Sequence, residues 1–292
     1  MKIGIVGLGL IGGSLAIDLR SQNHDLLGVS RQEATCKVAL EKGIVDLAST
    51  DLSILKAAEI IFICTPMDKI APIVEKLIPY LDNDTIVTDV GSVKQPIVEA
   101  CSKLWDNFIG GHPMAGTAQQ GINAAQSNLF QGAAYVFTPP DKSTGRTSPA
   151  LRGRGQPLAN LDKLKQLAVS LGAIPYICSP EVHDRAVAWI SHLPVMVSAG
   201  LVAACLGETD TDVLELAQNL ASSGFRDTSR VGGGNPELGT MMAQYNQDSL
   251  LRSLYGYRDR LEHIIELIET KNWDNLQQLL TENHQARPKF LN

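Results

Sequence analysis

A histidine and a serine in the first half of this chain are of types that could move a proton. His112 follows the apolar run Phe108-Ile109-Gly110-Gly111 and precedes Pro113, which predicts a short, shaped loop at the end of a strand. An imidazole titrates near pH 6.5, which suits a general base at neutral pH. Ser92 could hydrogen-bond this imidazole or a substrate hydroxyl. The alternative is that His112 is a loop histidine that binds only backbone.

The second half carries a histidine and two arginines that could contact a substrate. His192 stands in Ser191-His192-Leu193-Pro194. A proline inside a helix removes a hydrogen bond, so we expect a kink that turns His192 either into a cleft or into the core. Arg226 and Arg230 are candidates for a carboxylate clamp, because a guanidinium matches both carboxylate oxygens. Spacing does not choose between the two arginines, and one of them could instead pair with Asp227.

The N-terminal stretch predicts a dinucleotide site. Gly7, Gly9 and Gly12 fit G-x-G-x-x-G directly after a β-branched run at 2–6 and directly before an apolar helix pattern. In that context the first glycine permits a tight turn, the second admits a pyrophosphate and the third lets helix and strand pack closely. Free N–H groups at the helix start favour the anion. Further predicted cofactor contacts are Leu10, Ile11, Cys64, Thr65 and Pro66.

The end of the second predicted strand favours NADP over NAD. In NAD sites an acidic residue usually ends this strand and binds the ribose 2′-hydroxyl. Here the strand at 25–29 is followed by Ser30 and Arg31, with Thr35 close behind. A guanidinium and two hydroxyls would bind a 2′-phosphate, whereas a carboxylate would repel it. The alternative is that Arg31 stacks on adenine or lies in solvent.

Strand and helix patterns alternate through the first half and then give way to helices alone. This alternation predicts an α/β fold with a Rossmann-type, doubly wound parallel sheet, whose ligands bind beyond the C-terminal strand ends. We expect a nucleotide-binding domain at 1–179 and an all-α substrate and dimerisation domain at 180–292, beginning at Ser179-Pro180-Glu181. The stretch 221–234 is expected to be a polar, glycine-rich connection, and 139–157 a solvated surface insertion. The predicted strands are 2–6, 25–29, 59–64, 85–90, 108–111, 134–138 and 173–178; the later predicted helices are 181–205, 212–220, a helix from 236, 247–270 and 273–285.

Composition excludes several function classes. The 292 residues carry a formal net charge of −6 and are 44% hydrophobic, which argues against nucleic acid or an acidic membrane as partner. The five cysteines are scattered, so neither a zinc site nor a disulfide framework is expected. No uninterrupted apolar run is expected to approach a membrane span of about 20 residues, and we expect a cytoplasmic protein without a metal.

Five stretches together resemble the prephenate/arogenate dehydrogenase family of tyrosine biosynthesis, most of all its NADP-dependent arogenate dehydrogenases. The stretches are 7–14, 89–94, 111–116, 191–194 and 224–230. The resemblance implies that His112 is the catalytic base, Ser92 its hydroxyl partner, Arg230 the anchor for a substrate carboxylate and His192 a further contact. It also implies a homodimer formed through the helical domain. Ala118 stands where relatives that accept prephenate often carry an acidic residue, so the choice between the two substrates stays open.

The resemblance implies one reaction and leaves three alternatives. NADP-dependent oxidative decarboxylation of arogenate would yield tyrosine, with His112 removing the hydroxyl proton as hydride leaves the same carbon. A prephenate dehydrogenase using NAD or NADP is the nearest alternative. A hydroxyacid dehydrogenase would usually need a lysine base on the helix at 181–205, which has none. A non-catalytic NADP sensor would need no convergence of His112, Ser92 and Arg230.

Overall fold

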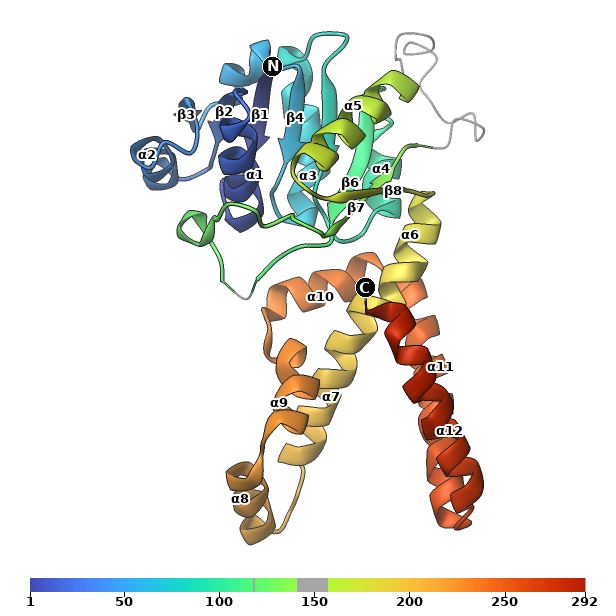
Figure 1. Cartoon of the computed structure of the whole chain (residues 1–292). Coiled ribbons are helices and arrows are strands. Elements are labelled where there is room, and N and C mark those ends of the chain that lie inside the picture. Colours follow the sequence, from blue (N-terminus) through green and yellow to red (C-terminus); the bar gives the residue numbers. More distant parts are fainter. Residues whose placement is uncertain (118, 141–156, 292) are drawn as a thin grey trace.

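Eight strands form one sheet in the order β3-β2-β1-β4-β5-β6-β7-β8. The computed structural model describes residues 1–117, 119–140 and 157–291. Helices lie on both faces of the sheet, and a group of helices extends away from it (Figure 1). The bounds in the first half are β1 (Lys2–Val6), α1 (Leu10–Ser21), β2 (Asp25–Val29), α2 (Glu33–Glu41), β3 (Leu47–Ser49), β4 (Ile60–Ile63), α3 (Met67–Leu77), β5 (Ile86–Asp89), α4 (Gln95–Cys101), β6 (Phe108–Pro113), β7 (Ala134–Thr138), α5 (Pro157–Ser170) and β8 (Ile174–Ile177).

The prediction of a parallel sheet is confirmed for β1 to β6 and wrong for the last two strands. β7 pairs with β6 in antiparallel register, His112 opposite Val136, and β8 runs parallel to β7. The chain from β6 to β7 contains only one short 3₁₀ turn, Ile122–Ala124, among its described residues. Without a crossover helix, the returning strand pairs antiparallel. All seven predicted strands exist, whereas β3 and helices α2 and α4 were not predicted.

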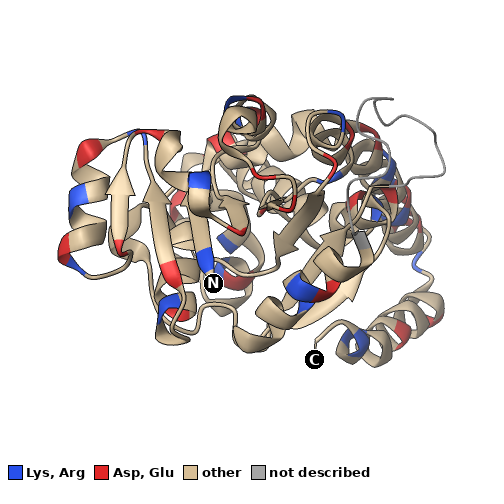
Figure 2. Ribbon diagram, turned by 90° about the horizontal axis from the view of Figure 1, so that it is seen from above, with Lys and Arg blue, Asp and Glu red and all other residues tan. Residues whose placement is uncertain are grey.

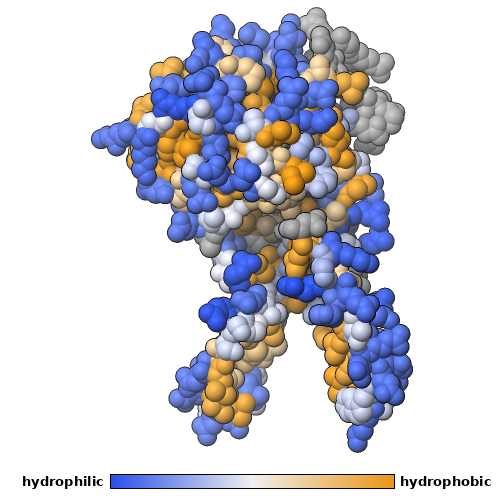
Figure 3. Space-filling view, viewed as in Figure 1, coloured by the Kyte–Doolittle hydropathy of each residue, from blue (hydrophilic) through white to orange (hydrophobic). Residues whose placement is uncertain are grey.

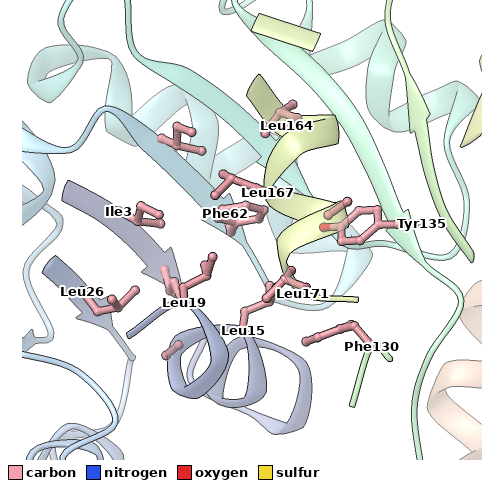
Figure 4. Close-up of a cluster of buried hydrophobic side chains, with 14 of the residues drawn as sticks. Ile3, Leu15, Leu19, Leu26, Phe62, Phe130, Tyr135, Leu164, Leu167 and Leu171 are labelled. Carbon is pink, nitrogen blue, oxygen red and sulfur yellow. The ribbon is translucent and has the colours of Figure 1, made fainter. Parts of the chain in front are cut away.

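Two apolar layers cover the sheet. One layer packs α1 and α5 against it through Leu15, Leu19 and Leu164, as Figure 4 shows beside Phe62 and Tyr135. The other packs α3 and α4 against the opposite face. Charged residues lie mostly on helices and at strand ends, and the strand ribbons are largely free of them (Figure 2). The strands buried on both faces explain the continuous apolar runs in the sequence.

The second half is helical, as predicted. Its elements are α6 (Pro180–Val187), a π-helical turn (Ala188–His192), α7 (Leu193–Leu206), α8 (Thr211–Leu220), α9 (Ser223–Ser229), a 3₁₀ turn (Arg230–Gly233), α10 (Pro236–Tyr245), α11 (Gln247–Glu269) and α12 (Trp273–Ala286). The predicted boundary after residue 179 falls between β8 and α6, where the Ser179 side chain accepts the Val182 N–H. Since α6 itself packs against α4 and β7, contacts do not mark a boundary there, and the limits 1–179 and 180–292 stay a prediction.

The predicted kink at Pro194 takes the form of a π-helical turn. Pro194 removes the hydrogen bond to Ile190, and the five residues before Leu193 widen into π geometry. The stretch 221–234, expected to be a polar, glycine-rich connection, is instead mostly helical: α9 and the 3₁₀ turn occupy most of it. Close packing on α7 explains this order, because a Cβ at Gly232 would lie 2.5 Å from the Ala199 nitrogen of α7.

The helical half forms two arms that diverge from the sheet. One arm contains α7, α8 and α9, and the other contains α11 and α12 (Figure 1). The helix Pro180–Leu206 has 27 residues and a mean hydropathy of 1.7, enough by length and composition to cross a membrane. Charged residues (Glu181, Asp184 and Arg185) and His192 interrupt its apolar residues, so the helix does not contradict the expectation about uninterrupted apolar runs. Such a helix is weak grounds for a membrane protein, because helices of soluble proteins meet the same criterion.

Candidate active site

The candidate site begins at the carboxyl ends of β4, β5 and β6, where parallel strands place loops side by side. Contrary to the prediction of a loop, His112 lies within β6 and is 8% exposed. The two preceding glycines make this possible. A Cβ at Gly111 would lie 2.6 Å from the Asp89 carbonyl oxygen of β5, and one at Gly110 would lie 2.4 Å from Thr138 Oγ1 of β7.

A fully buried ion pair is bonded to the backbone of Gly111, the residue before His112. Lys94 Nζ bonds the Asp89 carboxylate and donates to the Gly111 carbonyl oxygen at 2.8 Å. Asp89 in turn accepts the backbone N–H groups of Gly91 and Gly111, at 2.8 and 3.1 Å. The pair thus ties the end of β5 to the strand that carries His112. Burial lowers the pKa of Lys94, and the adjacent Asp89 opposes that shift.

Two residues of α6 that the sequence analysis missed complete the surroundings of His112. His112 Nδ1 lies 2.8 Å from His183 Nε2, and His183 Nδ1 lies 2.7 Å from Asp184 Oδ1. Asp184 also accepts the backbone N–H groups of Lys94 and Gln95. The sequence did show His183 and Asp184 side by side in the first turns of the helix after the last strand, which could have marked them as candidates. Spacing alone could not show that it reaches β6.

His192 lies in the π-helical turn with no exposed surface. The Asn246 amide nitrogen donates to the Asp184 carbonyl oxygen at 2.8 Å and lies 3.2 Å from His192 Nδ1. Because an amide nitrogen has only donors, Nδ1 is the acceptor and the imidazole hydrogen lies on Nε2. Nε2 is buried and has no partner among the described residues. His192 therefore carries a spare donor, which is what a substrate contact requires.

Both histidines are held neutral. Burial keeps the pKa of His112 well below its ordinary value, and the neighbouring cationic or protonatable groups of His183, Lys94 and His192 act in the same direction. Burial lowers the pKa of His192 to about 4, although Asp184 opposes this shift. An imidazole that is neutral at pH 7 has a lone pair available to accept a proton.

Among the described residues, the other predicted substrate residues make no hydrogen bond or ion pair to this cluster. Ser92 follows β5 at the same edge, but its Oγ bonds Met67 Sδ at 3.6 Å and not His112. Arg226 and Arg230 are exposed on α9 and the 3₁₀ turn, and neither pairs with Asp227 or with any other described residue. Ala118 and residues 141–156 of the predicted insertion lie outside the described residues.

The glycine stretch forms a cradle of the expected kind. Gly7 has φ +100°, and a Cβ there would lie 2.5 Å from the Cys64 carbonyl oxygen. A Cβ at Gly12 would lie 2.0 Å from the Gly7 oxygen, so this position also requires glycine. Gly9 faces open space, and no side chain caps the N-terminus of α1 at Leu10 and Ile11. The helix therefore presents free N–H groups to a ligand.

The remaining predicted cofactor residues surround this cradle. Thr65 Oγ1, beyond β4 and before Pro66, is buried without a partner among the described residues. Ser30 Oγ accepts the Gln32 N–H, and Thr35 Oγ1 bonds the Gln32 side chain. Arg31 is exposed and makes no ion pair within the described part of the chain. The described residues include no cluster of three His, Cys, Asp or Glu side chains suited to a metal ion.

Comparison with known proteins identifies the family. Residues 15–150 match the model of the prephenate dehydrogenase nucleotide-binding domain, and residues 179–282 match that of the prephenate dehydrogenase dimerization domain. The prephenate dehydrogenase of Bacillus subtilis (strain 168) is 30% identical over 280 residues, which are 93% of this chain and 71% of that protein. The chain belongs to the prephenate dehydrogenase family. Its relatives are oxidoreductases of tyrosine biosynthesis, so the resemblance inferred from the sequence is confirmed.

Members of this family with solved structures share the whole architecture. The crystal structure of Synechocystis arogenate dehydrogenase is 57% identical, covers 100% of both chains and has a TM-score of 0.86. The Aquifex aeolicus prephenate dehydrogenase in complex with hydroxyphenyl propionate and NAD+ is 26% identical, with a TM-score of 0.89 over 99% of this chain and 98% of that one. A cyclohexadienyl dehydrogenase of Zymomonas mobilis is 26% identical over 98% of this chain and 94% of that protein.

Proposed function

We propose that this dehydrogenase converts L-arogenate to L-tyrosine by NADP-dependent oxidative decarboxylation. The observation that carries the proposal is the neutral, buried imidazole of His112 at the same edge of the sheet as the glycine cradle. The 57% identity to an arogenate dehydrogenase over the full chain supports arogenate as the substrate.

A nicotinamide dinucleotide fits the cradle. Gly7, Gly9 and Gly12 would hold its pyrophosphate against the N-terminus of α1, with Leu10 and Ile11 supplying N–H groups and Cys64, Thr65 and Pro66 lining the side. Ser30, Arg31 and Thr35 would bind a 2′-phosphate, because Arg31 is exposed and unpaired among the described residues. When bound, the nicotinamide supplies the acceptor for hydride.

The protein side chains bind the substrate and remove its hydroxyl proton. His112 Nε2 removes the proton from the substrate ring hydroxyl, while the hydrogen on the same carbon leaves as hydride. The ring carboxylate departs as carbon dioxide and the ring becomes aromatic, which makes the step irreversible. His112 returns its proton to the phenolate oxygen, which gives the phenol of tyrosine and restores the base. His192 Nε2–H donates to the substrate, Ser92 bonds its hydroxyl or His112, and a guanidinium binds a carboxylate.

Arg230 is the preferred carboxylate anchor and Arg226 the alternative. The 3₁₀ turn that begins at Arg230 packs through Gly232 on Ser198 and Ala199 of α7, and the Thr228 carbonyl oxygen accepts the Ser198 hydroxyl. Ser198 follows His192 by six residues, roughly 9 Å along a helix axis. An arginine side chain can bridge such a separation to one end of a ring-sized substrate.

A homodimer formed through the two arms completes the proposal. Large apolar side chains on both arms are exposed in the single chain: Leu206, Leu216, Leu220, Leu261, Ile265 and Ile268. Figure 3 shows hydrophobic surface, in orange, on both arms. The matching family model describes this region as a dimerization domain. Apolar surface of this extent is typical of an interface. We further propose a cytoplasmic protein with neither membrane nor nucleic acid as partner.

Prephenate dehydrogenase activity is the second candidate, because the curated relatives at 26–30% identity include prephenate dehydrogenases and a cyclohexadienyl dehydrogenase. The deciding experiment measures kcat/KM for arogenate and for prephenate, each with NADP and with NAD. The proposal expects the highest value for arogenate with NADP. A higher value for prephenate would overturn the choice of substrate, and a higher value with NAD would overturn the choice of cofactor.

A further inference from the structure

A chain of three buried side chains connects the two halves of the molecule at the candidate base. His112 comes from β6 of the sheet, and His183 and Asp184 come from α6 of the helical half. The successive distances are 2.8 Å from His112 Nδ1 to His183 Nε2 and 2.7 Å from His183 Nδ1 to Asp184 Oδ1. His183 and Asp184 are each 2% exposed, so water does not compete for these bonds.

The Asp184 carboxylate sets the direction of both hydrogen bonds in this series of side chains. An ionised carboxylate has only acceptors, so His183 Nδ1 carries a hydrogen and donates it. In a neutral His183 the other nitrogen, Nε2, then has a lone pair and accepts from His112 Nδ1. His112 therefore carries its hydrogen on Nδ1 and its lone pair on Nε2. That is the tautomer required of a base acting through Nε2.

Backbone groups fix the position of the Asp184 carboxylate. Oδ1 accepts the Lys94 N–H at 2.7 Å, and Oδ2 accepts the Gln95 N–H at 2.8 Å. Both donors belong to the segment that follows β5, so the carboxylate is held by the sheet although it belongs to α6. Its orientation toward His183 is consequently set by the junction of the two halves.

We infer that His183 and Asp184 are positioning residues that fix the tautomer of His112 and stabilise the positive charge formed there. This inference rests on the proposed function, in which His112 is the base. His112 takes the substrate hydroxyl proton at Nε2 and becomes an imidazolium, and its Nδ1–H remains hydrogen-bonded to His183. The Asp184 carboxylate compensates the added charge through His183.

The other charged and titratable groups around the pair do not supply this compensation. His192 of the π-helical turn and Lys94 of the sheet half both disfavour a positive charge on His112. Asp89 is engaged by Lys94 and by the backbone N–H groups of Gly91 and Gly111. Asp184 is thus the carboxylate that the hydrogen bonds connect to the imidazole.

The first test reads the tautomer directly in the free enzyme. The chain has six histidines, so ¹⁵N-histidine labelling gives a tractable NMR spectrum. We expect His112 to show the Nδ1–H tautomer, assigned by its loss in His112→Asn. In His183→Leu, which removes the acceptor, we expect a mixture of the two tautomers. His112 in the Nε2–H form in the unmodified protein, or an unchanged signal in His183→Leu, would overturn the inference.

The second test uses variants that separate positioning from folding. His183→Leu should lower kcat by about 10²-fold or more, and His183→Gln, whose amide oxygen can still accept, should recover part of the loss. Asp184→Asn should move the acidic limb of the kcat/KM profile to lower pH, because a base without its carboxylate partner binds protons less tightly. Ser179→Ala removes the cap of the same helix and should lower only the melting temperature.

The outcomes also separate this inference from the proposed function. Equal kcat losses in His183→Leu and His183→Gln, with the pH profile of Asp184→Asn unmoved, would contradict a positioning role. Full activity of His112→Asn would instead contradict the choice of base, whatever the tautomer. The NMR measurement needs no substrate, so it stays informative even if arogenate proves to be the wrong substrate.

Discussion

At the scale of single residues, the chemistry depends on one neutral imidazole. His112→Asn keeps a polar side chain but removes the base, and we expect kcat to fall by about 10²–10⁴-fold. NADP affinity should be unchanged, because His112 is separate from the glycine cradle. Steady-state kinetics together with a fluorescence titration of NADPH check both parts. Turnover within threefold of the unmodified enzyme would exclude His112 as the base.

Cofactor choice is also a property of a few side chains. The double variant Ser30→Asp with Arg31→Ala places a carboxylate beside the ribose and removes the exposed guanidinium. We expect the ratio of kcat/KM for NADP to that for NAD to fall from above one to below one. The matched control is Lys37→Ala on α2, where an exposed cation pairs only with Glu41. A ratio unchanged in the double variant would refute the assignment.

Some of the site was predictable residue by residue and some was not. His112, His192 and the glycines stand in short local patterns that specify a turn, a kink or a cradle. His183 and Asp184 were missed because their role depends on contact across 71 residues with His112, which no local pattern reveals. The prediction that His112 lies on a loop failed because Gly110 and Gly111 extend β6 between two close neighbours, so they do not end the strand.

At the scale of elements, the 3₁₀ turn that begins with Arg230 is positioned by its contact with α7. Gly232→Ala would place a Cβ 2.5 Å from the Ala199 nitrogen, so the turn must move away from the helix. We expect an increase in the substrate KM of about 10-fold with kcat less affected, similar in kind to Arg230→Ala. Gly233→Ala is the matched control, because its Cβ meets nothing within 4 Å.

The substrate KM of Gly232→Ala and of the two arginine variants distinguishes the possible carboxylate anchors. If Gly232→Ala and Arg230→Ala leave KM unchanged while Arg226→Ala raises it, the clamp belongs to Arg226. The element itself was mispredicted because three successive glycines at 232–234 read as an open connection. The packing of this backbone on Ser198 and Ala199 is tertiary, and it outweighs the weak helix propensity of glycine.

At the scale of the whole molecule, the arms require a partner for their apolar faces. Leu261→Asp places a charge on α11 at a side chain that is 45% exposed in the single chain. We expect sedimentation equilibrium to give the mass of one chain for this variant and of two chains for the unmodified protein. Leu158→Asp is the control, since this 79% exposed leucine lies on α5 of the sheet half. Dimers of equal stability in both variants would move the interface elsewhere.

The overall plan was largely predictable, whereas the assembly of its two halves was not. Alternating strand and helix patterns identified the sheet, and uninterrupted helical patterns identified the arms. The antiparallel β7 and β8 escaped prediction because strand direction depends on how the chain returns, which the segment between β6 and β7 does not signal. The long apolar helix at 181–205 was predicted, whereas the π-helical turn within it was not, because the sequence indicated only a kink at Pro194.

The anchoring of Asp184 by the backbone of Lys94 and Gln95 has a consequence for how the enzyme fails. A substitution that loosens α6 from the sheet would leave the tautomer and orientation of His112 unfixed, while the glycine cradle stays intact. Such a protein would still retain dinucleotide on an affinity column yet be inert toward substrate. A screen that measures only nucleotide binding would therefore not detect substitutions at the contact between α6 and the Lys94–Gln95 backbone.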